Sequence, residues 1–255
     1  MTSIIQCHDV GLHFANEQKP VLANINVQVQ AGEFVSIIGK SGSGKTTLLK
    51  MIGGLLQPST GDIHVLGRRI SEPIEECTYV FQKPVLLEWR TVLENVLVPI
   101  EVKRRLKQAD KEQAKAIIQT VGLAGHEDKY PHELSGGMMS RVTLARALLT
   151  QPKILLMDEP FAALDAMTKD QLQLELMQLS SQFSTTIVFI THDITEAVYL
   201  SDRVLLLGGQ PAEVAHEYTI PFSKLRPKEL KFNPSFTGIV KEIYETIETV
   251  GASSR

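Results

Sequence analysis

The chain has 255 residues, 43% apolar and 22% charged, which suits one large domain, or a domain with an inserted lobe, around its own core. The net charge of −3 gives no reason to expect nucleic acid as a partner, and the two cysteines, Cys7 and Cys77, have neither disulfide-framework nor metal-ligand spacing, as is typical of a reducing, intracellular setting. No apolar run reaches the roughly 18 residues of a membrane span, and Met1–Val10 lacks the features of a signal peptide, so we expect membrane contact only through a partner protein.

The first 90 residues combine β patterns with one helix. Alternating or β-branched residues predict strands at Ile4–Asp9, Ile25–Val29, Asp62–Leu66 and Thr78–Gln82. The apolar run Glu33–Ile38 predicts a buried strand that stops at Gly39. A helix is predicted from Gly44 to about Gly53.

The remaining chain changes pattern twice. From Thr91 to Thr150 it is mainly helical, and the basic stretch Glu101–Lys115 is interpreted as a solvated helix face. From Lys153 the alternation of strands and helices returns, with Val204–Leu207 as the last core strand. The other elements predicted there are strands Ile154–Met157 and Thr186–Ile190, a helix that buries Leu172, Leu176 and Leu179, and a helix capped by Asp193 with Glu196.

The C-terminal residues predict an amphipathic helix. Asn233 is a plausible N-cap and Pro234 a plausible first helical residue. Its predicted apolar face comprises Phe236, Ile239, Val240, Ile243, Tyr244 and Ile247.

These elements predict an α/β fold with a mainly parallel sheet. We expect a single domain over residues 1–255, in which 1–90 and 151–222 form the sheet core. Residues of about 91–150 form an inserted helical lobe, and 223–255 form a C-terminal helical tail.

Residues Gly39–Thr46 read G-K-S-G-S-G-K-T, the pattern of a phosphate-binding loop between a buried strand and a helix. Glycines let successive backbone N–H groups turn inward, and the helix start adds its free N–H groups. Lys45 supplies a positive charge for the β- and γ-phosphates, and Thr46 a hydroxyl for Mg²⁺. The predicted nucleotide-binding residues here are Gly39, Lys40, Ser41, Gly42, Ser43, Gly44, Lys45, Thr46 and Thr47.

A second group of residues supplies what hydrolysis needs. Asp158 ends the strand at 154–157, where a carboxylate can help to hold Mg²⁺, and Glu159 beside it can act as general base on the attacking water. His192 follows another strand and is placed to hold that water in line. Gln82, at a predicted strand end, can sense metal and phosphate through its amide.

With L-S-G-G-M at residues 134–138, these motifs resemble the nucleotide-binding subunit of ABC transporters over nearly the whole chain. The resemblance implies the P-loop ATPase fold with an N-terminal antiparallel β subdomain, and ATP and Mg²⁺ as ligands. In that comparison 39–46 is Walker A, 154–159 Walker B, Gln82 the Q-loop, Ala163–Asp165 the D-loop and His192 the switch histidine. Phe14 takes the place of the aromatic residue that stacks on adenine.

The resemblance also implies a dimer. Ser135, Gly136 and Gly137 open a helix and would serve the ATP of a second subunit, with Asp165 along the interface. ATP binding would close this dimer and hydrolysis reopen it. Met138 replaces the usual glutamine, and because the serine and glycine N–H groups make the main anion contacts, we expect activity to survive. Phe14 replaces a commoner tyrosine and keeps the stacking face.

Finer features resemble importers of the nitrate, sulfonate and taurine type, among them L-E-W-R-T-V-L-E-N-V at 87–96 and D-E-P-F-A-A-L-D-A-M-T-K at 158–169. This resemblance implies a peripheral location at the cytoplasmic face of the inner membrane, a separate solute-binding protein and a permease subunit. The permease would contact a groove lined by Leu86, Leu87, Trp89 and Val92.

Other functions fit less well. ATPases of DNA repair or chromosome structure insert long coiled coils, whereas only 87 residues separate Thr46 from Leu134. Translation-associated and antibiotic-resistance ATPases normally carry two cassettes, and this chain has one. An exporter or lipid-transport ATPase is excluded less firmly. A module without turnover is disfavoured by Lys45, Asp158, Glu159 and His192.

Overall fold

The computed structural model describes residues 3–15 and 19–252. Residues 1–2 of the segment Met1–Val10 and residues 253–255 of the predicted tail 223–255 lie outside the described part. The described strands are β1 (Ser3–Leu12), β2 (Leu22–Gln30), β3 (Phe34–Gly39), β4 (Thr60–Val65), β5 (Arg68–Arg69), β6 (Cys77–Val80), β7 (Ile154–Asp158), β8 (Thr186–Ile190), β9 (Arg203–Gly209) and β10 (Ala212–Thr219). The α-helices are α1 (Lys45–Ile52), α2 (Val92–Glu101), α3 (Gln108–Thr120), α4 (Gly136–Leu149), α5 (Ala166–Phe183), α6 (Ile194–Leu200) and α7 (Pro234–Ala252), with short 3₁₀ helices η1 (Pro131–Glu133) and η2 (Lys228–Phe232).

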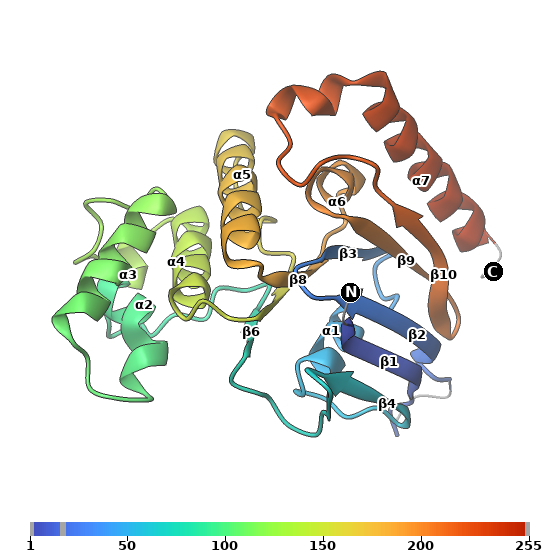
Figure 1. The fold of residues 1–255 in the computed structure, drawn as a ribbon, viewed down its shortest axis with the longest axis horizontal. Coiled ribbons are helices and arrows are strands. Elements are labelled where there is room, and N and C mark those ends of the chain that lie inside the picture. The colour runs from blue at the N-terminus through green and yellow to red at the C-terminus, as the bar shows by residue number, and fades with distance from the viewer. Residues whose placement is uncertain (1–2, 16–18, 253–255) are drawn as a thin grey trace.

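The strands form one sheet in the order β5-β4-β1-β2-β10-β9-β3-β8-β7-β6. From β9 to β6 all neighbours run parallel, whereas β1, β2, β4 and β5 are antiparallel to one another. The sequence prediction of a mainly parallel sheet with an antiparallel N-terminal part is therefore confirmed. Figure 1 shows the two parts side by side, with β1, β2 and β4 below β3 and β9.

The parallel strands are buried on both faces, which explains their continuous apolar sequences. Along β8, Ile187 and Phe189 belong to one hydrophobic core, while Val188 and Ile190 belong to the other. Successive side chains of a strand point to opposite faces, so each face receives its own layer of helices. Helix α1 packs against β3, β7 and β8 and shares the core of Val188 and Ile190. Helices α6 and α7 contact β9 and belong to the core of Ile187 and Phe189.

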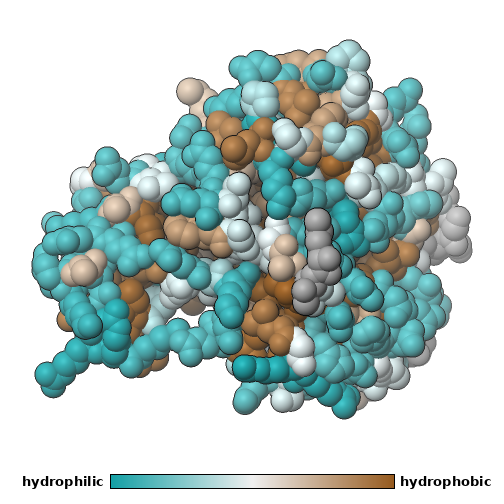
Figure 2. Space-filling view, viewed as in Figure 1, coloured by the Kyte–Doolittle hydropathy of each residue, from teal (hydrophilic) through white to brown (hydrophobic). Residues whose placement is uncertain are grey.

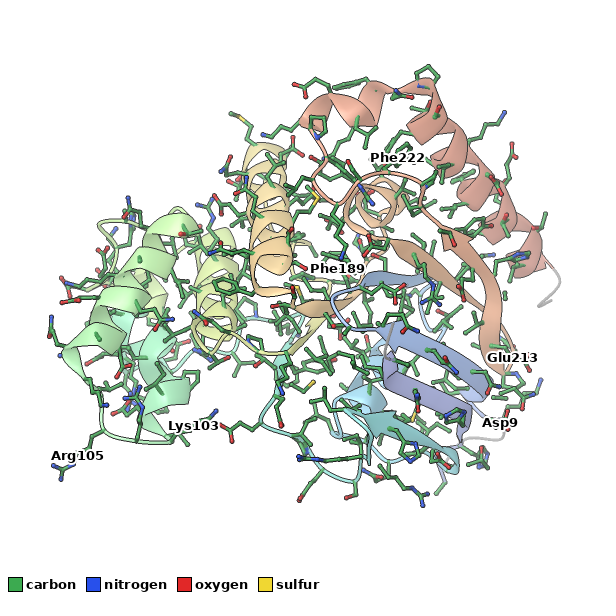
Figure 3. All side chains as sticks on the ribbon, viewed as in Figure 1. Asp9, Lys103, Arg105, Phe189, Glu213 and Phe222 are labelled. Carbon is green, nitrogen blue, oxygen red and sulfur yellow. The ribbon has the colours of Figure 1, made fainter. Side chains whose placement is uncertain are left out.

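Helices α2, α3 and α4 pack on one another and form the inserted helical lobe, at the left of Figure 1. Its interior includes the buried residues Val96, Leu97, Ala114, Ile118 and Val142. The basic stretch between α2 and α3 lies at its tip, where Lys103 pairs with Glu75 and Figure 3 shows Arg105 pointing away from the body. Their side chains are exposed, in agreement with the predicted solvated face.

The C-terminal tail is tied to α6 by Arg226. The buried guanidinium group donates to five carbonyl oxygens, those of Val198, Tyr199, Ser201, Phe222 and Ser223. Since three of them belong to the last residues of α6 and its C-cap, the arginine satisfies helix-end carbonyls that water cannot reach. Helix α7 then begins at Pro234, and the Asn233 side chain accepts a hydrogen bond from Ser235 N, as predicted for an N-cap.

Three sequence predictions differ from the structure. Val204–Leu207 is not the last strand, because β10 follows and pairs with both β9 and β2. The strand expected to reach Gln82 ends at Val80, where its pairing with β7 stops. Tyr244 is 55% exposed rather than part of the apolar face, because Ile243 takes the core position and the next residue lies about 100° around the helix.

Figure 2 shows hydrophilic residues over most of one face, with apolar residues in separate patches between them. Within residues 3–15 and 19–252, none of the helices combines the length and the apolar character that crossing a lipid bilayer requires.

Helix α7 offers a test of this packing. Phe236 is 1% exposed and its ring stacks on Phe222 with 6.0 Å between centroids. Phe236→Ala should lower the free energy of unfolding by roughly 3–5 kcal/mol through lost burial and the cavity left behind. Tyr244→Ala, on the same helix, should change it by less than about 0.5 kcal/mol. Urea unfolding followed by circular dichroism measures both, and equal losses would contradict the assigned faces.

Candidate functional site

The glycine-rich loop connects β3 to α1, as the sequence predicts. Gly42 and Gly44 both have φ of 80°, a left-handed conformation that residues with a side chain rarely adopt. A Cβ on Gly44 would lie 2.7 Å from Leu22 Cδ2, and one on Gly39 would lie 2.5 Å from the carbonyl oxygen of Leu207. The loop therefore depends on glycine for its backbone shape and for its close approach to β2 and β9.

The loop holds two polar groups away from water. Lys45 is 8% exposed, and its Nζ donates to the carbonyl oxygens of Gly39 and Lys40 at 2.9 Å. Burial lowers the pKa of Lys45, although the charges of Glu159 and Asp158 act to raise it. The hydroxyl oxygen of Ser43 is buried and finds no hydrogen-bond partner among the described residues. Since buried polar atoms are normally satisfied, this hydroxyl is suited to a ligand in the loop.

Asp158 lies at the end of β7, next to the first turn of α1. Its carboxylate accepts hydrogen bonds from Thr46 Oγ1 at 3.1 Å and from the Tyr79 hydroxyl at 3.4 Å. Burial raises the pKa of Asp158, while the hydrogen bond from Thr46 acts to lower it. Tyr79 was not among the predicted site residues, because its contact with Asp158 arises only when β6 pairs with β7. Burial, together with Asp158, raises the pKa of the Tyr79 hydroxyl, which therefore stays a donor.

Glu159 has a backbone conformation uncommon for a residue with a side chain. Its φ is 47°, and its N–H donates to the carbonyl oxygen of Ile190 at the end of β8. Such strain costs on the order of 1–3 kcal/mol and is typical of functional sites. Its Oε2 lies 3.1 Å from Gln82 Nε2 and 3.2 Å from His192 Nδ1. The structure thus brings three predicted residues together, with Gln82 in the loop after β6 rather than at a strand end.

The remaining predicted residues lie in other segments. Ser135 caps α4 by accepting from Met138 N at 3.3 Å, and Gly136 and Gly137 form the first turn. The Met138 side chain packs against the hydrophobic core. Asp165 caps α5 by accepting from Thr168 N at 3.0 Å.

The helix start at Gly137 lies close to the loop before α5, since a Cβ there would be 3.4 Å from Leu164 Cδ2. No hydrogen bond between described residues joins Ser135–Met138 to the glycine-rich loop.

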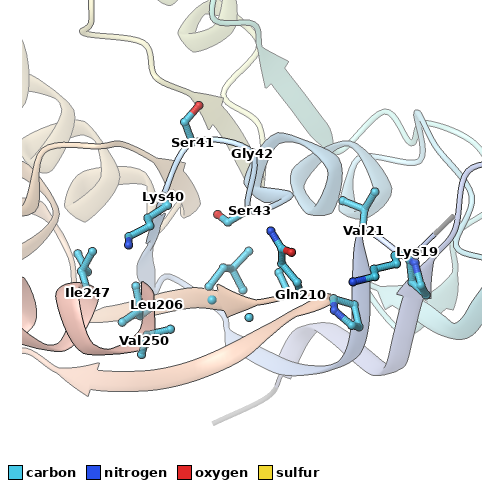
Figure 4. A pocket seen from close by; sticks show the side chains of 16 residues that line it. Lys19, Val21, Lys40, Ser41, Gly42, Ser43, Leu206, Gln210, Ile247 and Val250 are labelled. Atoms are coloured by element: carbon cyan, nitrogen blue, oxygen red, sulfur yellow. The ribbon is translucent and has the colours of Figure 1, made fainter. Parts of the chain in front are cut away.

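Two cavities adjoin these residues. The larger, about 520 Å³, lies between the loop Lys40–Ser43, the β9–β10 turn and the end of α7. Figure 4 shows Lys40 and Ile247 on one side of it and Lys19 and Val21 on the other. Phe14 is 39% exposed and lies in the segment after β1, before the cavity-lining residues Lys19 and Val21 in the sequence. The smaller cavity, about 110 Å³, is lined by Glu159 and His192 together with residues of α5 and α6.

An apolar segment follows Gln82 on the surface. Trp89 is 73% exposed, and Leu86 and Leu87 are half-buried. Val92, expected to line a groove here, is 1% exposed and belongs to the core, because it begins α2.

The buried side chain of Asn95 shapes this segment. Asn95 Nδ2 donates to the carbonyl oxygens of Leu87, Arg90 and Thr91, and Oδ1 accepts from Leu87 N and from Arg146 of α4. The surface segment therefore has a fixed shape linked to the helical lobe.

Comparisons with known proteins agree with this arrangement. The model of the ABC transporter family matches residues 22–162. The chain is 39% identical to an aliphatic sulfonates import ATP-binding protein of Bacillus cereus over 249 residues, which covers 97% of each chain. It is 45% identical to a bicarbonate transport ATP-binding protein of Synechocystis over 233 residues, or 89% of this chain and 83% of the relative.

Among solved structures, an ATP-binding cassette determined as a dimer in a post-hydrolysis state with ADP and Pi superposes with a TM-score of 0.77. It is 31% identical and covers 86% of this chain and 100% of its own. The resemblance expected from the motifs is thus confirmed by both kinds of comparison. The chain belongs to the ABC transporter family, as one of its ATP-binding proteins.

Proposed function

We propose that this chain binds and hydrolyses Mg-ATP at the site around Gly39–Thr46 and Glu159, and that hydrolysis powers a membrane importer. The observation that carries this proposal is the convergence of Gln82 and His192 on the carboxylate of Glu159, beside the glycine-rich loop. The relatives named for sulfonate import and bicarbonate transport support a small anionic solute. Nitrate is also a small anion, and taurine carries a sulfonate group within a zwitterion.

ATP binding follows from the loop and its neighbours. The backbone N–H groups of residues 39–47 face the phosphates, and Lys45 exchanges its two carbonyl acceptors for the more strongly charged β- and γ-phosphate oxygens. The buried hydroxyl of Ser43 gains the partner it lacks within the described chain. Phe14 offers its exposed ring face to adenine.

The residues present fit a magnesium ion. Thr46 Oγ1 and Asp158 Oδ1 lie 3.1 Å apart and are oxygen donors of the kind that Mg²⁺ prefers, with Gln82 contributing its amide oxygen. No cluster of three or more histidine, cysteine or acidic side chains suited to a metal occurs in the described residues. This agrees with an ion that is held mainly by phosphate and water. When bound, it neutralises charge on the β- and γ-phosphates.

Hydrolysis then depends on Glu159. Its carboxylate accepts the proton of the attacking water, while Gln82 and His192 fix the carboxylate and the water relative to the γ-phosphate. The two adjacent carboxylates have different partners, Thr46 and Tyr79 for Asp158 and Gln82 and His192 for Glu159, so they would serve metal and base separately.

The second anion site calls for a second copy of the chain. Ser135, Gly136, Gly137 and Met138 open α4 and would contact the γ-phosphate of ATP bound by the other subunit, with Asp165 at the interface. The dimeric state of the similar cassette supports this arrangement. Closure of the dimer on two ATP molecules and its reopening after hydrolysis would move the attached permease.

The permease contact is proposed at the surface segment of Leu86, Leu87 and Trp89, at the cytoplasmic face of the inner membrane. Its exposed tryptophan and its fixed backbone suit a docking surface that must transmit movement. A separate solute-binding protein would deliver the solute.

Within the chain, the proposed division remains 1–90 and 151–222 as core, about 91–150 as helical lobe and 223–255 as tail.

Replacing the base tests hydrolysis directly. Glu159→Gln keeps the shape but cannot accept a proton, so ATP turnover should fall at least about 100-fold while ATP binding persists. Phosphate release and equilibrium binding of labelled ATP measure the two properties. Glu112→Gln, an exposed glutamate on α3, should leave both unchanged. Turnover at the parental rate in the Glu159 variant would refute its assignment as base.

Replacing the loop lysine tests nucleotide binding. Lys45→Ala removes charge-assisted hydrogen bonds, and affinity for Mg-ATP should fall about 10- to 100-fold, the ratio that roughly 1.5–3 kcal/mol produces. Fluorescent-nucleotide titration measures the affinity, with the exposed Lys153→Ala as control. Equal affinities for the two variants would place the triphosphate elsewhere.

The docking surface can be tested against an equally exposed aromatic residue. Trp89→Ala should weaken association with the permease subunit by about 2 kcal/mol or more, roughly 30-fold, and leave the chain's own ATPase rate and unfolding unchanged. Phe232→Ala, 85% exposed in the tail, should not affect association. Co-purification and titration of the detergent-solubilised complex report the difference, and unimpaired association of the Trp89 variant would argue against this surface.

A further inference from the structure

A charged network links α5 and α6 beside the residues proposed for hydrolysis. Lys169, in the first turn of α5, places its Nζ 2.8 Å from Asp193 Oδ2 and 3.1 Å from Glu196 Oε1. Asp193 caps α6 through Glu196 N and directly follows His192. The lysine thus holds the start of α6 from the neighbouring helix.

The network is partly buried: the side chains of Lys169 and Asp193 are 24% and 38% exposed. Glu196 is 4% exposed and also accepts from Gln173 Nε2 at 2.9 Å. Burial acts to lower the pKa of Lys169, but the hydrogen bond to Asp193 and the charge of Glu196 outweigh it, so the pKa is raised. Burial likewise acts to raise the pKa of Asp193, and the hydrogen bond from Lys169 brings it below its usual value. Both groups remain charged, and a paired, partly buried network of this kind keeps its members in one geometry.

The imidazole of His192 has little else to orient it. Its side chain is 70% exposed and its one described hydrogen bond is to Glu159, at 3.2 Å. The direction of the ring therefore depends on the backbone between β8 and the Asp193 cap. Lys169 lines the same cavity of about 110 Å³ as Glu159 and His192, which places the network beside the pair.

We propose that Lys169 is a positioning residue for ATP hydrolysis, because it fixes the Asp193 cap and thereby holds His192 against Glu159. This inference rests on the proposed function. Lys169 makes no contact with nucleotide in this scheme and acts through His192 alone. Since Asp165, on the proposed subunit interface, caps α5, the same contact joins that interface to His192.

Substitution of Lys169 separates this role from nucleotide binding. Lys169→Met should lower kcat for ATP hydrolysis by the chain at least 10-fold and change KM for ATP less than threefold, because the glycine-rich loop is untouched. Lys169→Arg, which keeps the charge and the donors, should restore kcat to within threefold of the parent. Lys241→Met removes a lysine that pairs with Glu245 on the exposed side of α7 and should have no effect.

A double substitution shows whether Lys169 works through the histidine. In a chain that already carries His192→Ala, Lys169→Met should produce no further fall in kcat. An equal fall in both backgrounds would overturn the proposal, and so would a parental rate for Lys169→Met alone.

Asp193→Asn covers the case in which Lys169→Met fails to fold. Asparagine still caps a helix, so folding should be retained, while the lysine loses its charged partner and kcat should again fall at least 10-fold. A well-folded Asp193→Asn variant with parental kcat would overturn the proposal. A parental chain without any ATP hydrolysis would instead refute the proposed function.

Discussion

The parallel alignment of β3, β8 and β7 is the constraint on which the site depends. In register, Ile37 lies beside Ile190, and Ile190 beside Asp158, so the three strands finish at one edge of the sheet. The glycine-rich loop, the acidic pair and His192 leave the sheet from that edge. Residues more than 100 positions apart in sequence are thereby brought within hydrogen-bond distance, as in Thr46 with Asp158.

The site places charges where water is scarce, and this prepares it for an ionic ligand. Burial shifts the pKa of Lys45 downward and that of Asp158 upward, in each case toward the neutral form. A group that is held in such surroundings gains more from an opposite charge than an exposed one does. The proposed triphosphate and metal ion would supply both signs at once, a negative partner for Lys45 and a positive one for Asp158.

The sequence identified the segments that meet at this edge of the sheet better than it predicted the details of the fold. The glycine-rich loop, Asp158, Glu159 and His192 are local motifs beside strongly apolar strands, and their spacing carries the chemistry. Strand β10 was not predicted, because most of its residues are not buried and so lack a clear apolar pattern. The turn residues Gly208 to Pro211 nevertheless indicate a hairpin.

Contacts between distant segments were also beyond prediction. The contacts of Tyr79 with Asp158 and of Lys169 with Asp193 exist only once β6 has paired with β7 and α5 has packed beside α6. Val92 and Tyr244 were misplaced for a related reason. Periodicity gives the helix but not the exact boundary of its buried face.

The buried guanidinium of Arg226 bears on how such cassettes can be recombined. It enters a pocket made of main-chain oxygens, three of them from the end of α6 and its C-cap, and the Tyr199 hydroxyl in turn donates to the carbonyl of Arg226. Because those acceptors are backbone atoms, they need the donors of an arginine whatever side chains surround them. A chimaera joined between residues 200 and 226 must therefore inherit an arginine at this point, or it will leave several carbonyls of its own core without donors. A junction placed beyond α7 avoids that requirement.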